Sequence, residues 1–447
     1  MSLRKYIGYG VTAVLTLCAA AVPSIAAEVP QSVIDSAFYT YKNGGPTAPG
    51  LKQGMLITKD NVDTFKDILN PATFDFIKKG DYEMQVGKTI DFTLHSRFIE
   101  ATRKYGGNVA IGADGNLTNY VAGRPFPKDP DPNDPQAGTK LAWNFQYGRV
   151  WGDLGCINPF IWDYRDYETG KLQREINYNM FCLKRFAFRT VDPPLPEYDP
   201  NPEKLYRGIY VRVESPDDIR GTQLLIHKYK DDNKQSDLWL DLGFQRRVRR
   251  FPTGQTTDSF LGTDLMIEDF EGYNGRISDY TWTYKGTKNL MTAFWDRNDV
   301  KNKGKQHTFK EADGKTWEFT SFNGKGQCHI DAPFQLRKTY ILEGRPKDPS
   351  HPISKRVIYM DAETAEMPIT EIYDRKGELW KQFVIGWSHP DKGSPDMDKG
   401  TGADIGDAVY MIDVQSRHCT TLSFHGLVSP TLVPDSTFSL QNMRGND

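Results

Sequence analysis

The chain has 447 residues, a formal net charge of -2 and a mean hydropathy of -0.59. This length suits one large domain or two of ordinary size, and a charge so near zero argues against nucleic acid as a partner. Aromatic residues make up 12% of the chain, many in alternating runs, which favours sheet over a helix bundle.

The first residues read as an export signal. Arg4 and Lys5 form a basic start, and an apolar stretch over 6–22 leads to small residues at the spacing of a cleavage site. We expect cleavage after Ala26 or Ala27. No later segment is apolar and long enough to span a bilayer. The mature chain is therefore expected to be soluble and exported.

Residues 27–150 are expected to form a helical region with one hairpin. Residues 28–59 are rich in glycine and proline and are predicted to be irregular. Capping residues, glycine stops and apolar spacing then predict the following elements: a helix from Asp60 that restarts at Pro71 and ends at Gly80, a helix over Phe92–Tyr105, a hairpin over Val109–Val121 and a helix over Lys140–Trp151.

Residues 151–447 repeat one unit, a strand, a short polar turn and a strand, which is typical of an antiparallel meander. The clearest predicted strands are Ile157–Tyr167, Leu172–Arg189, Tyr206–Glu214, Thr222–Tyr229, Gln335–Glu343, Lys355–Asp361, Met367–Asp374, Leu379–Trp387 and Ala408–Ser423. Such a sheet needs an apolar cover. The expected fold is therefore α+β, a curved and mostly antiparallel β half-barrel wrapping or covered by helices, with both regions in one compact unit.

The stretch 236–282 is the most distinctive part of the chain. A first strand carries Leu238 and Leu240 on one face and Trp239 on the other. A second strand over Phe244–Phe251 contains four arginines, and a further strand is expected over Arg276–Lys285. A short helix over 263–270 is a further possibility.

The string LWLDLGFQRRVRRF, followed by SFLGTDLMIEDF, resembles the core of the outer-membrane lipoprotein-sorting (LolA-like) superfamily. It is most similar to the long periplasmic branch of that superfamily, a domain of unknown function that accompanies resistance-nodulation-division transporters. The resemblance is most specific over 205–282 and extends over 156–189 and 356–387. Gly243 stands where that core usually has proline. The resemblance implies a lipid-binding half-barrel with helices as a lid and no known reaction.

Four cysteines follow the export signal: Cys156, Cys182, Cys328 and Cys419. In an oxidising compartment they allow two disulfides. A hairpin turning at Thr169 sets Cys156 opposite Cys182, because the two are equally far from Thr169 along the chain. A bulge near Pro159 would break that register. We favour Cys156–Cys182, with Cys328–Cys419 by elimination, and four buried thiols remain the alternative.

Motifs for catalysis are weak. The pairs Cys328-His329 and His418-Cys419 offer metal ligands, but adjacent residues on a strand point to opposite faces, so a disulfide or burial is preferred. The segment 386–390 begins like a nucleophile elbow but lacks its second glycine. Paired carboxylates at Glu268-Asp269 fit a helix start or a contact to the arginine run better than a glycosidase. We therefore expect no enzymatic activity, no cofactor and no metal.

A ligand site is the remaining hypothesis. Aromatic and apolar side chains of the central stretch are candidates to line a cavity for a greasy ligand, and two arginines are candidates for its charged rim or for pairing with Asp264 or Glu268 inside the fold. An ordinary core and a solvated edge strand are the alternatives. The candidates are Trp239, Phe260, Leu265, Phe270, Tyr280, Trp282, Arg247 and Arg249.

The preferred functional hypothesis is a periplasmic carrier that shields a lipid or another hydrophobic molecule. The resemblance implies an inner-membrane transporter or an outer-membrane protein as its partner. Two alternatives remain open, a non-enzymatic adaptor subunit of an envelope complex and a secreted hydrolase. An adaptor would have a filled core and a large apolar surface patch.

Overall fold

The computed structural model describes residues 28–148, 152–243, 247–251, 256–301, 307–311, 314–403 and 405–444. The expected export signal and its cleavage site lie outside these residues. Within the described ranges, the search for a helix long and apolar enough to cross a membrane finds none.

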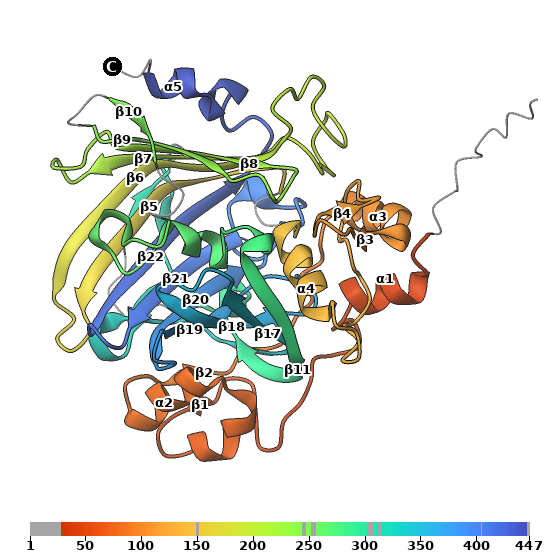
Figure 1. Ribbon diagram of the computed structural model, residues 1–447. Helices are drawn as coiled ribbons and strands as arrows, with labels where there is room; N and C mark the ends of the chain where they lie inside the picture. Colours follow the sequence, from red (N-terminus) through yellow and green to blue (C-terminus); the bar gives the residue numbers. More distant parts are fainter. Residues whose placement is uncertain are drawn as a thin grey trace, which may run out of the picture.

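One large curved sheet dominates the molecule (Figure 1). It has 14 strands, and its path runs β10-β9-β8-β7-β6-β5-β22-β21-β20-β19-β18-β17-β11, with β12 pairing in parallel to β20. Every other pairing along this path is antiparallel. The path ends at β10 on one side and at β11 on the other. The expected α+β fold with a curved, mostly antiparallel and incomplete barrel is confirmed.

The strands of this sheet are β5 (Leu154–Asp166), β6 (Leu172–Arg185), β7 (Leu205–Ser215), β8 (Gln223–Tyr229), β9 (Asp237–Asp241), β10 (Val248–Arg250), β11 (Tyr280–Thr292), β12 (Phe294–Trp295), β17 (Gln335–Pro346), β18 (Ile353–Asp361), β19 (Ile369–Asp374), β20 (Leu379–Ser388), β21 (Ile405–Asp413) and β22 (His418–Val428). Four small pairs complete the strands: β1 (Leu56–Ile57) with β2 (Met84–Gln85), β3 (Ala110–Ile111) with β4 (Leu117–Thr118), β13 (Thr308–Lys310) with β14 (Thr316–Glu318), and β15 (Phe322–Asn323) with β16 (His329–Ile330).

The helices are short. The α-helices are α1 (Gln31–Phe38), α2 (Pro71–Lys79), α3 (Ser96–Tyr105), α4 (Ala137–Gln146) and α5 (Leu440–Arg444). The described 3-10 helices are η1 (Val62–Ile68), η2 (Gly106–Asn108), η4 (Phe260–Gly262), η5 (Ile267–Gly272), η6 (Ile277–Asp279), η7 (Arg297–Asp299), η8 (Lys325–Gln327), η9 (Asp396–Asp398) and η10 (Asp435–Phe438).

The N-terminal helices differ from the expectation at three points. Helix α1 lies in a stretch predicted to be irregular. Helix α3 begins at Ser96 because the Nδ1 atom of His95 accepts a hydrogen bond from the Arg97 N–H at 3.0 Å and caps the helix, while Phe92 joins the core of the sheet. Helix α4 begins before Lys140, at the end of the proline-rich loop. The expected hairpin over 109–121 is present as β3 and β4.

Both expected disulfides are present, Cys156–Cys182 and Cys328–Cys419. Strands β5 and β6 pair with Cys156 opposite Cys182, and the register is the same on both sides of Pro159. Closer to the turn a bulge shifts the pairing by one residue. Tyr167 therefore does not pair with Lys171, as the simple register predicts, and its N–H donates to the carbonyl of Arg417.

The two faces of the sheet have different covers. We call the residues 48–86 and 319–336 the outer cover, since their apolar side chains pack on the outer face of β18 to β22. Helix α5 and η10 cover the outer face of β7 and β8 (Figure 1). Helix α4 packs against β11, and α1 packs against α3. The inner face holds a third element, the irregular segment that follows β10.

The central stretch is less regular than predicted. Strand β10 covers only 248–250 of the expected second strand, and residues 244–246 lie outside the described ranges. The expected helix over 263–270 is replaced by η4 and η5, with left-handed backbone at Leu261 (φ 52°) and Glu271 (φ 60°). The polar groups of this segment bond to residues of the sheet, whereas those of a continuous helix would bond to its own backbone. Strand β11 begins at Tyr280, four residues later than predicted, and runs to Thr292.

Candidate binding site inside the curve of the sheet

The inner face of the sheet is a continuous apolar surface. Alternate residues of β5 to β8 and of β20 to β22 point to it, because successive side chains on a strand face opposite sides. The buried residues that β5 to β8 contribute to this surface are Ile157, Phe160, Trp162, Ile176, Tyr178, Phe181, Leu183, Ile209, Val211, Val213, Leu224 and Ile226. A surface of this size must be covered to be stable in water.

One irregular segment covers it. We call residues 259–275 the plug; they contain η4 and η5 and lie within the curve of the sheet (Figure 1). Phe260, Leu265 and Phe270 are buried on the inner face. The ring of Phe270 lies tilted against that of Phe181, with the ring centroids 5.5 Å apart. The plug thus covers the apolar inner face with its own side chains.

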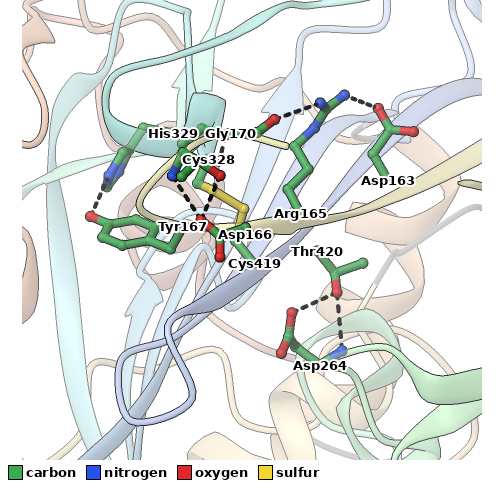
Figure 2. Close-up of a disulfide and its surroundings, with 12 residues drawn as sticks. Asp163, Arg165, Asp166, Tyr167, Gly170, Asp264, Cys328, His329, Cys419 and Thr420 are labelled. Atoms are coloured by element: carbon green, nitrogen blue, oxygen red, sulfur yellow. Dashed lines mark hydrogen bonds and ion pairs between the residues drawn. A yellow bond between two sulfur atoms is a disulfide. The ribbon is translucent and has the colours of Figure 1, made fainter. Parts of the chain in front are cut away.

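Hydrogen bonds fix the plug to strands β20 and β22 of the sheet. The hydroxyl of Thr420 on β22 donates to Asp264 at 2.8 Å and accepts the Asp264 N–H at 3.0 Å (Figure 2). The ammonium of Lys381 on β20 donates to the Asp264 carbonyl. Burial raises the pKa of Asp264 to about 7, although Thr420 and Lys381 both lower it.

Ion pairs fix the plug to β18. The guanidinium of Arg356, which is fully buried, donates to Asp269 at 2.7 Å and to Glu268 at 3.2 Å. Glu268 also accepts the Tyr280 hydroxyl at 2.6 Å and lies 3.1 Å from the Nε2 atom of His351. Burial raises the pKa of Glu268, but Arg356 and His351 outweigh it and hold that pKa below its usual value. The ion pair with Arg356 therefore favours the ionised form of the Glu268 carboxylate while the plug covers the sheet.

The space left beside the plug is small. A cavity of about 40 Å³ lies between the plug and the sheet, lined by apolar and aromatic side chains and by one carboxylate, Glu271. Sites for drug-sized ligands usually enclose roughly 300–1,000 Å³. The inner face therefore has room for a ligand of that size only after the plug moves.

A larger hollow lies at the edge of the plug. Its volume is about 610 Å³, and Glu268, Tyr280, Asn274 and His351 are among the residues that line it. This hollow therefore lies beside the plug's ion pairs with β18.

The candidate residues separate into three groups. Phe260, Leu265 and Phe270 meet in the plug, where they are packed in the core of the inner face. Tyr280 and Trp282 belong to a different apolar cluster that contains α4 and the start of β11. Tyr280 still reaches the plug through its hydroxyl.

The other three candidates lie away from the inner face. Trp239 points to the outer face of β9, where its ring meets His227 edge-on at 5.0 Å. Arg247 and Arg249 are exposed at the edge strand β10. They do not pair with Asp264 or Glu268, which bond to Lys381 and Arg356, and the edge-strand alternative fits them.

Sequence reasoning missed the residues that hold the plug. Lys381, Arg356 and Arg207 lie on three different strands, so no motif in the sequence groups them. The one available signal is a charged residue at an inward position of an alternating apolar strand. Arg207 is such a residue, two positions before Ile209 in the alternation of β7.

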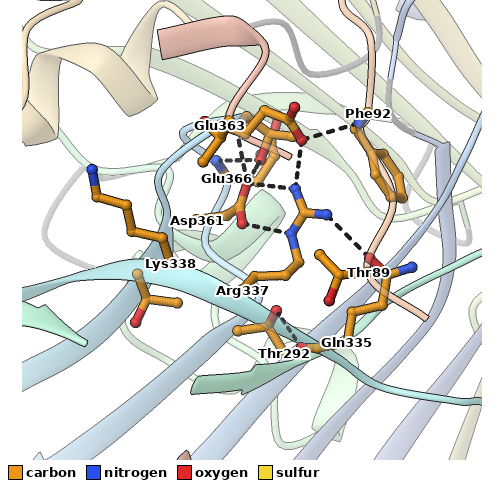
Figure 3. A network of polar contacts seen from close by, with 12 residues as sticks. Thr89, Phe92, Thr292, Gln335, Arg337, Lys338, Asp361, Glu363 and Glu366 are labelled. Atoms are coloured by element: carbon orange, nitrogen blue, oxygen red, sulfur yellow. Dashed lines mark hydrogen bonds and ion pairs between the residues drawn. The ribbon is translucent and has the colours of Figure 1, made fainter. Parts of the chain in front are cut away.

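A second buried arginine stabilises the fold itself. Arg337 on β17 donates to Asp361 and Glu363, each at 2.7 Å, and to the carbonyl of Ile90 at 2.8 Å (Figure 3). Burial raises the pKa of Glu363 to about 8 against the opposing effect of Arg337. This cluster joins the N-terminal region to the sheet and does not contact the plug.

Cysteine and histidine do not form the metal site considered from the sequence, because both cysteines are in a disulfide. His329 stacks on Tyr82 at 4.7 Å, and burial lowers its pKa to about 3. Figure 2 shows His329 beside the disulfide, with its Nε2 atom 3.2 Å from the Tyr167 hydroxyl. Within the described ranges one group brings carboxylates and a histidine together, Asp163, Glu175 and His307. The guanidinium of Arg165 already pairs with Asp163 there.

Comparison with known proteins gives one family and several distant structures. The family model described as "Protein of unknown function (DUF1329)" matches residues 56–444. A DUF1329 family protein from Desulfovibrio piger is 17% identical, with a TM-score of 0.46 over 70% of this chain and 100% of that one. An outer membrane lipoprotein-sorting protein domain from Vibrio parahaemolyticus is 18% identical, with a TM-score of 0.45 over 70% and 100%.

A third structure is more distant. A LolA superfamily protein from Nitrosomonas europaea is 13% identical, with a TM-score of 0.37 over 69% of this chain and 98% of that one. A search of curated proteins found no match.

Proposed function

We propose that this chain, which belongs to the DUF1329 family, is a periplasmic carrier without enzymatic activity. The description of the family assigns no function. The protein shields an acyl chain or a similar hydrophobic molecule on the inner face of its sheet. The observation that carries this proposal is the plug. A broad apolar surface is covered by a segment whose regular structure is limited to the short 3-10 helices η4 and η5. Side-chain hydrogen bonds and ion pairs attach this segment to the sheet, rather than strand pairing.

The mechanism is an exchange of apolar contacts. When the plug leaves, Phe260, Leu265 and Phe270 withdraw from the inner face and the ligand covers the same surface. Burial of apolar area stabilises by roughly 25 cal/mol per Å² in either state. The ligand thus replaces the apolar contacts that the plug gives up, and return of the plug would release the ligand.

The partner supplies the direction of transport. The resemblance of residues 205–282 to proteins that accompany resistance-nodulation-division transporters supports an inner-membrane transporter or an outer-membrane protein as donor or acceptor. A carrier of this kind would receive its ligand at one membrane and release it at the other.

The test is lipid transfer between vesicles with the purified mature protein. Donor vesicles carry a fluorescent fatty acid, and acceptor vesicles are separated from them by a dialysis membrane. We expect the protein to accelerate transfer and to retain bound probe in native mass spectrometry.

Two results would overturn the carrier function. Absence of both transfer and bound probe would favour an adaptor subunit, whose plug never leaves the sheet. Turnover of an ester probe at a constant rate would favour a hydrolase.

A further inference from the structure

Three cations form a row across the inner face at one end of the apolar surface. We propose that this row, Arg185 on β6, Arg207 on β7 and Lys228 on β8, is the site for the carboxylate headgroup of an acyl-chain ligand. The inference rests on the carrier function proposed above and names the class of its ligand.

Strand register places the three side by side. In the strand register, Arg185 of β6 lies opposite Arg207 of β7, and Arg207 lies opposite Lys228 of β8. The next inward positions along the same strands are Leu183, Ile209 and Ile226, all of which lie in the apolar surface. The row is therefore the polar end of a continuous apolar strip, as a headgroup site for an amphiphile must be.

The row carries more positive charge than its direct partners neutralise. Arg185 donates to the backbone carbonyls of Tyr147 and Gly148, which bring no charge. Lys228 donates to the Asn274 carbonyl at 3.0 Å and the Gly275 carbonyl at 3.2 Å, both in the plug.

Among the described residues, only Arg207 of the row has a carboxylate in direct contact, Glu271 of the plug. Glu366 acts on Arg207 from further away, and Asp232 and Asp279 act on Lys228.

Burial makes the uncompensated charge costly. Burial, followed by the repulsion of Arg207, lowers the pKa of Lys228 to about 7. Burial also lowers the pKa of Arg207 to about 10, with Arg185 adding to the effect. An anion that enters the row relieves this repulsion, which is the physical reason for expecting one.

Glu271 has the geometry of a stand-in for the ligand. Its side chain is 8% exposed, its carboxylate meets Arg207, and it lines the small apolar cavity together with Phe160, Phe181 and Phe270. It is thus a carboxylate at the end of an apolar body, which is the chemistry of a fatty acid. Its Oε1 atom has no hydrogen-bond partner among the described residues.

The backbone at Glu271 is held in an unfavourable conformation. Its φ of 60° lies in the left-handed region, which is unfavourable for a residue other than glycine. Gly272 follows with φ 102°, and a Cβ atom there would lie 3.0 Å from Met367. A ligand carboxylate that replaces Glu271 releases this strain.

The experiment compares two probes that differ only in the headgroup, oleate and oleyl alcohol, in competition with a fluorescent fatty acid. In the wild type we expect oleate to bind at least tenfold more tightly. Arg207→Met should weaken oleate by about tenfold to a hundredfold, the usual range for a buried charged hydrogen bond, and change oleyl alcohol by less than threefold.

Two further variants separate recognition from folding. Glu271→Gln removes the competing carboxylate and should tighten oleate severalfold, which a folding defect cannot do. Arg212→Met is the matched control, because Arg212 lies on the same strand with the opposite parity; it should leave both probes unchanged.

The outcomes distinguish the inference from the function on which it rests. If neither probe binds the wild type and no phosphatidylglycerol is transferred, the carrier function fails. If both bind equally and neither Arg207→Met nor Glu271→Gln changes the ratio, the carrier stands and the headgroup site is wrong. Transfer of phosphatidylglycerol from vesicles without oleate binding would assign the row to a lipid phosphate and overturn the carboxylate.

Discussion

The two covers of the sheet differ in how they are attached, and two neighbouring residues on β22 make the difference visible. Cys419 points to the outer face and forms the disulfide with Cys328 of the outer cover. Thr420 points to the inner face and makes hydrogen bonds to Asp264 of the plug (Figure 2). A covalent bond fixes one cover, and exchangeable polar contacts fix the other. Under the proposed function, it is therefore the inner face that would be uncovered.

The largest expected effect concerns the ion pairs of the plug. Arg356→Met leaves Glu268 and Asp269 buried without their cation, and we expect a loss of about 3–5 kcal/mol in the free energy of unfolding. Urea titration measures it. Because the loss falls on the plug, limited proteolysis should cut within 259–275 before the rest of the chain.

The matched control is Arg345→Met, whose pair with Glu343 is 54% exposed on the arginine side. Such surface pairs contribute about 1 kcal/mol or less. An Arg356→Met protein as stable as this control would show that the plug does not depend on its ion pairs.

The second prediction concerns the outer cover. Replacing Cys328 and Cys419 by serine removes a crosslink between positions 91 residues apart, and we expect a loss of about 2–5 kcal/mol. The binding of a fluorescent fatty acid, measured below the unfolding transition, should stay within twofold of the wild type. A large loss of binding at full folding would mean that the two covers are coupled.

The third prediction uses the pKa of Asp264, raised from 3.8 to about 7 by burial. The native state keeps this proton while the unfolded state loses it, so the contribution of Asp264 to stability falls as pH rises from about 4 to about 7. We expect the stability difference between Asp264→Asn and the wild type to grow in favour of the variant between pH 5 and pH 8.

Two other buried acids also lower the stability of the protein as pH rises. The pKa of Asp398 is raised to about 7 and that of Glu363 to about 8, both mainly by burial. The comparison with Asp264→Asn cancels their contribution because both proteins keep them. An equal pH profile for the two proteins would place the pKa of Asp264 at its ordinary value.

The smallest expected effect tests which face binds. Trp239 lies on the outer face and Phe270 on the inner face. Trp239→Ala should change the affinity for a fluorescent fatty acid by less than twofold, whereas Phe270→Ala should raise it, because the plug loses its largest apolar contact. A stronger effect of the Trp239 variant would place the ligand on the opposite face.

Local patterns made much of the sheet predictable. The sequence alone places Cys156 opposite Cys182, because a turn near Thr169 sets the register that β5 and β6 keep from Leu154 to Tyr164, beyond the bulge beside the turn. Strand alternation also marks the inward residues of β7. The same rule places Trp239 opposite Leu238 and Leu240, but it does not say which of the two faces lies inside the curve.

The plug was not predictable in the same way. Residues 259–275 contain apolar side chains at helix-like intervals, but their backbone turns left-handed at Leu261 and Glu271 because bonds to distant strands replace those of a helix. The cation row is also a product of register. Arg185, Arg207 and Lys228 are separated widely along the chain and meet only when three strands align.

The cation row has a kinetic consequence. If Glu271 left Arg207 before a ligand arrived, three cations would face an apolar, water-poor surface without a direct counterion. That empty state is high in energy, so an incoming anion should help to displace Glu271 as it binds, and Glu271 should help to expel the anion when it leaves. Release would then accelerate with the concentration of a competing carboxylate, and an idle carrier would retain its ligand until an acceptor is present.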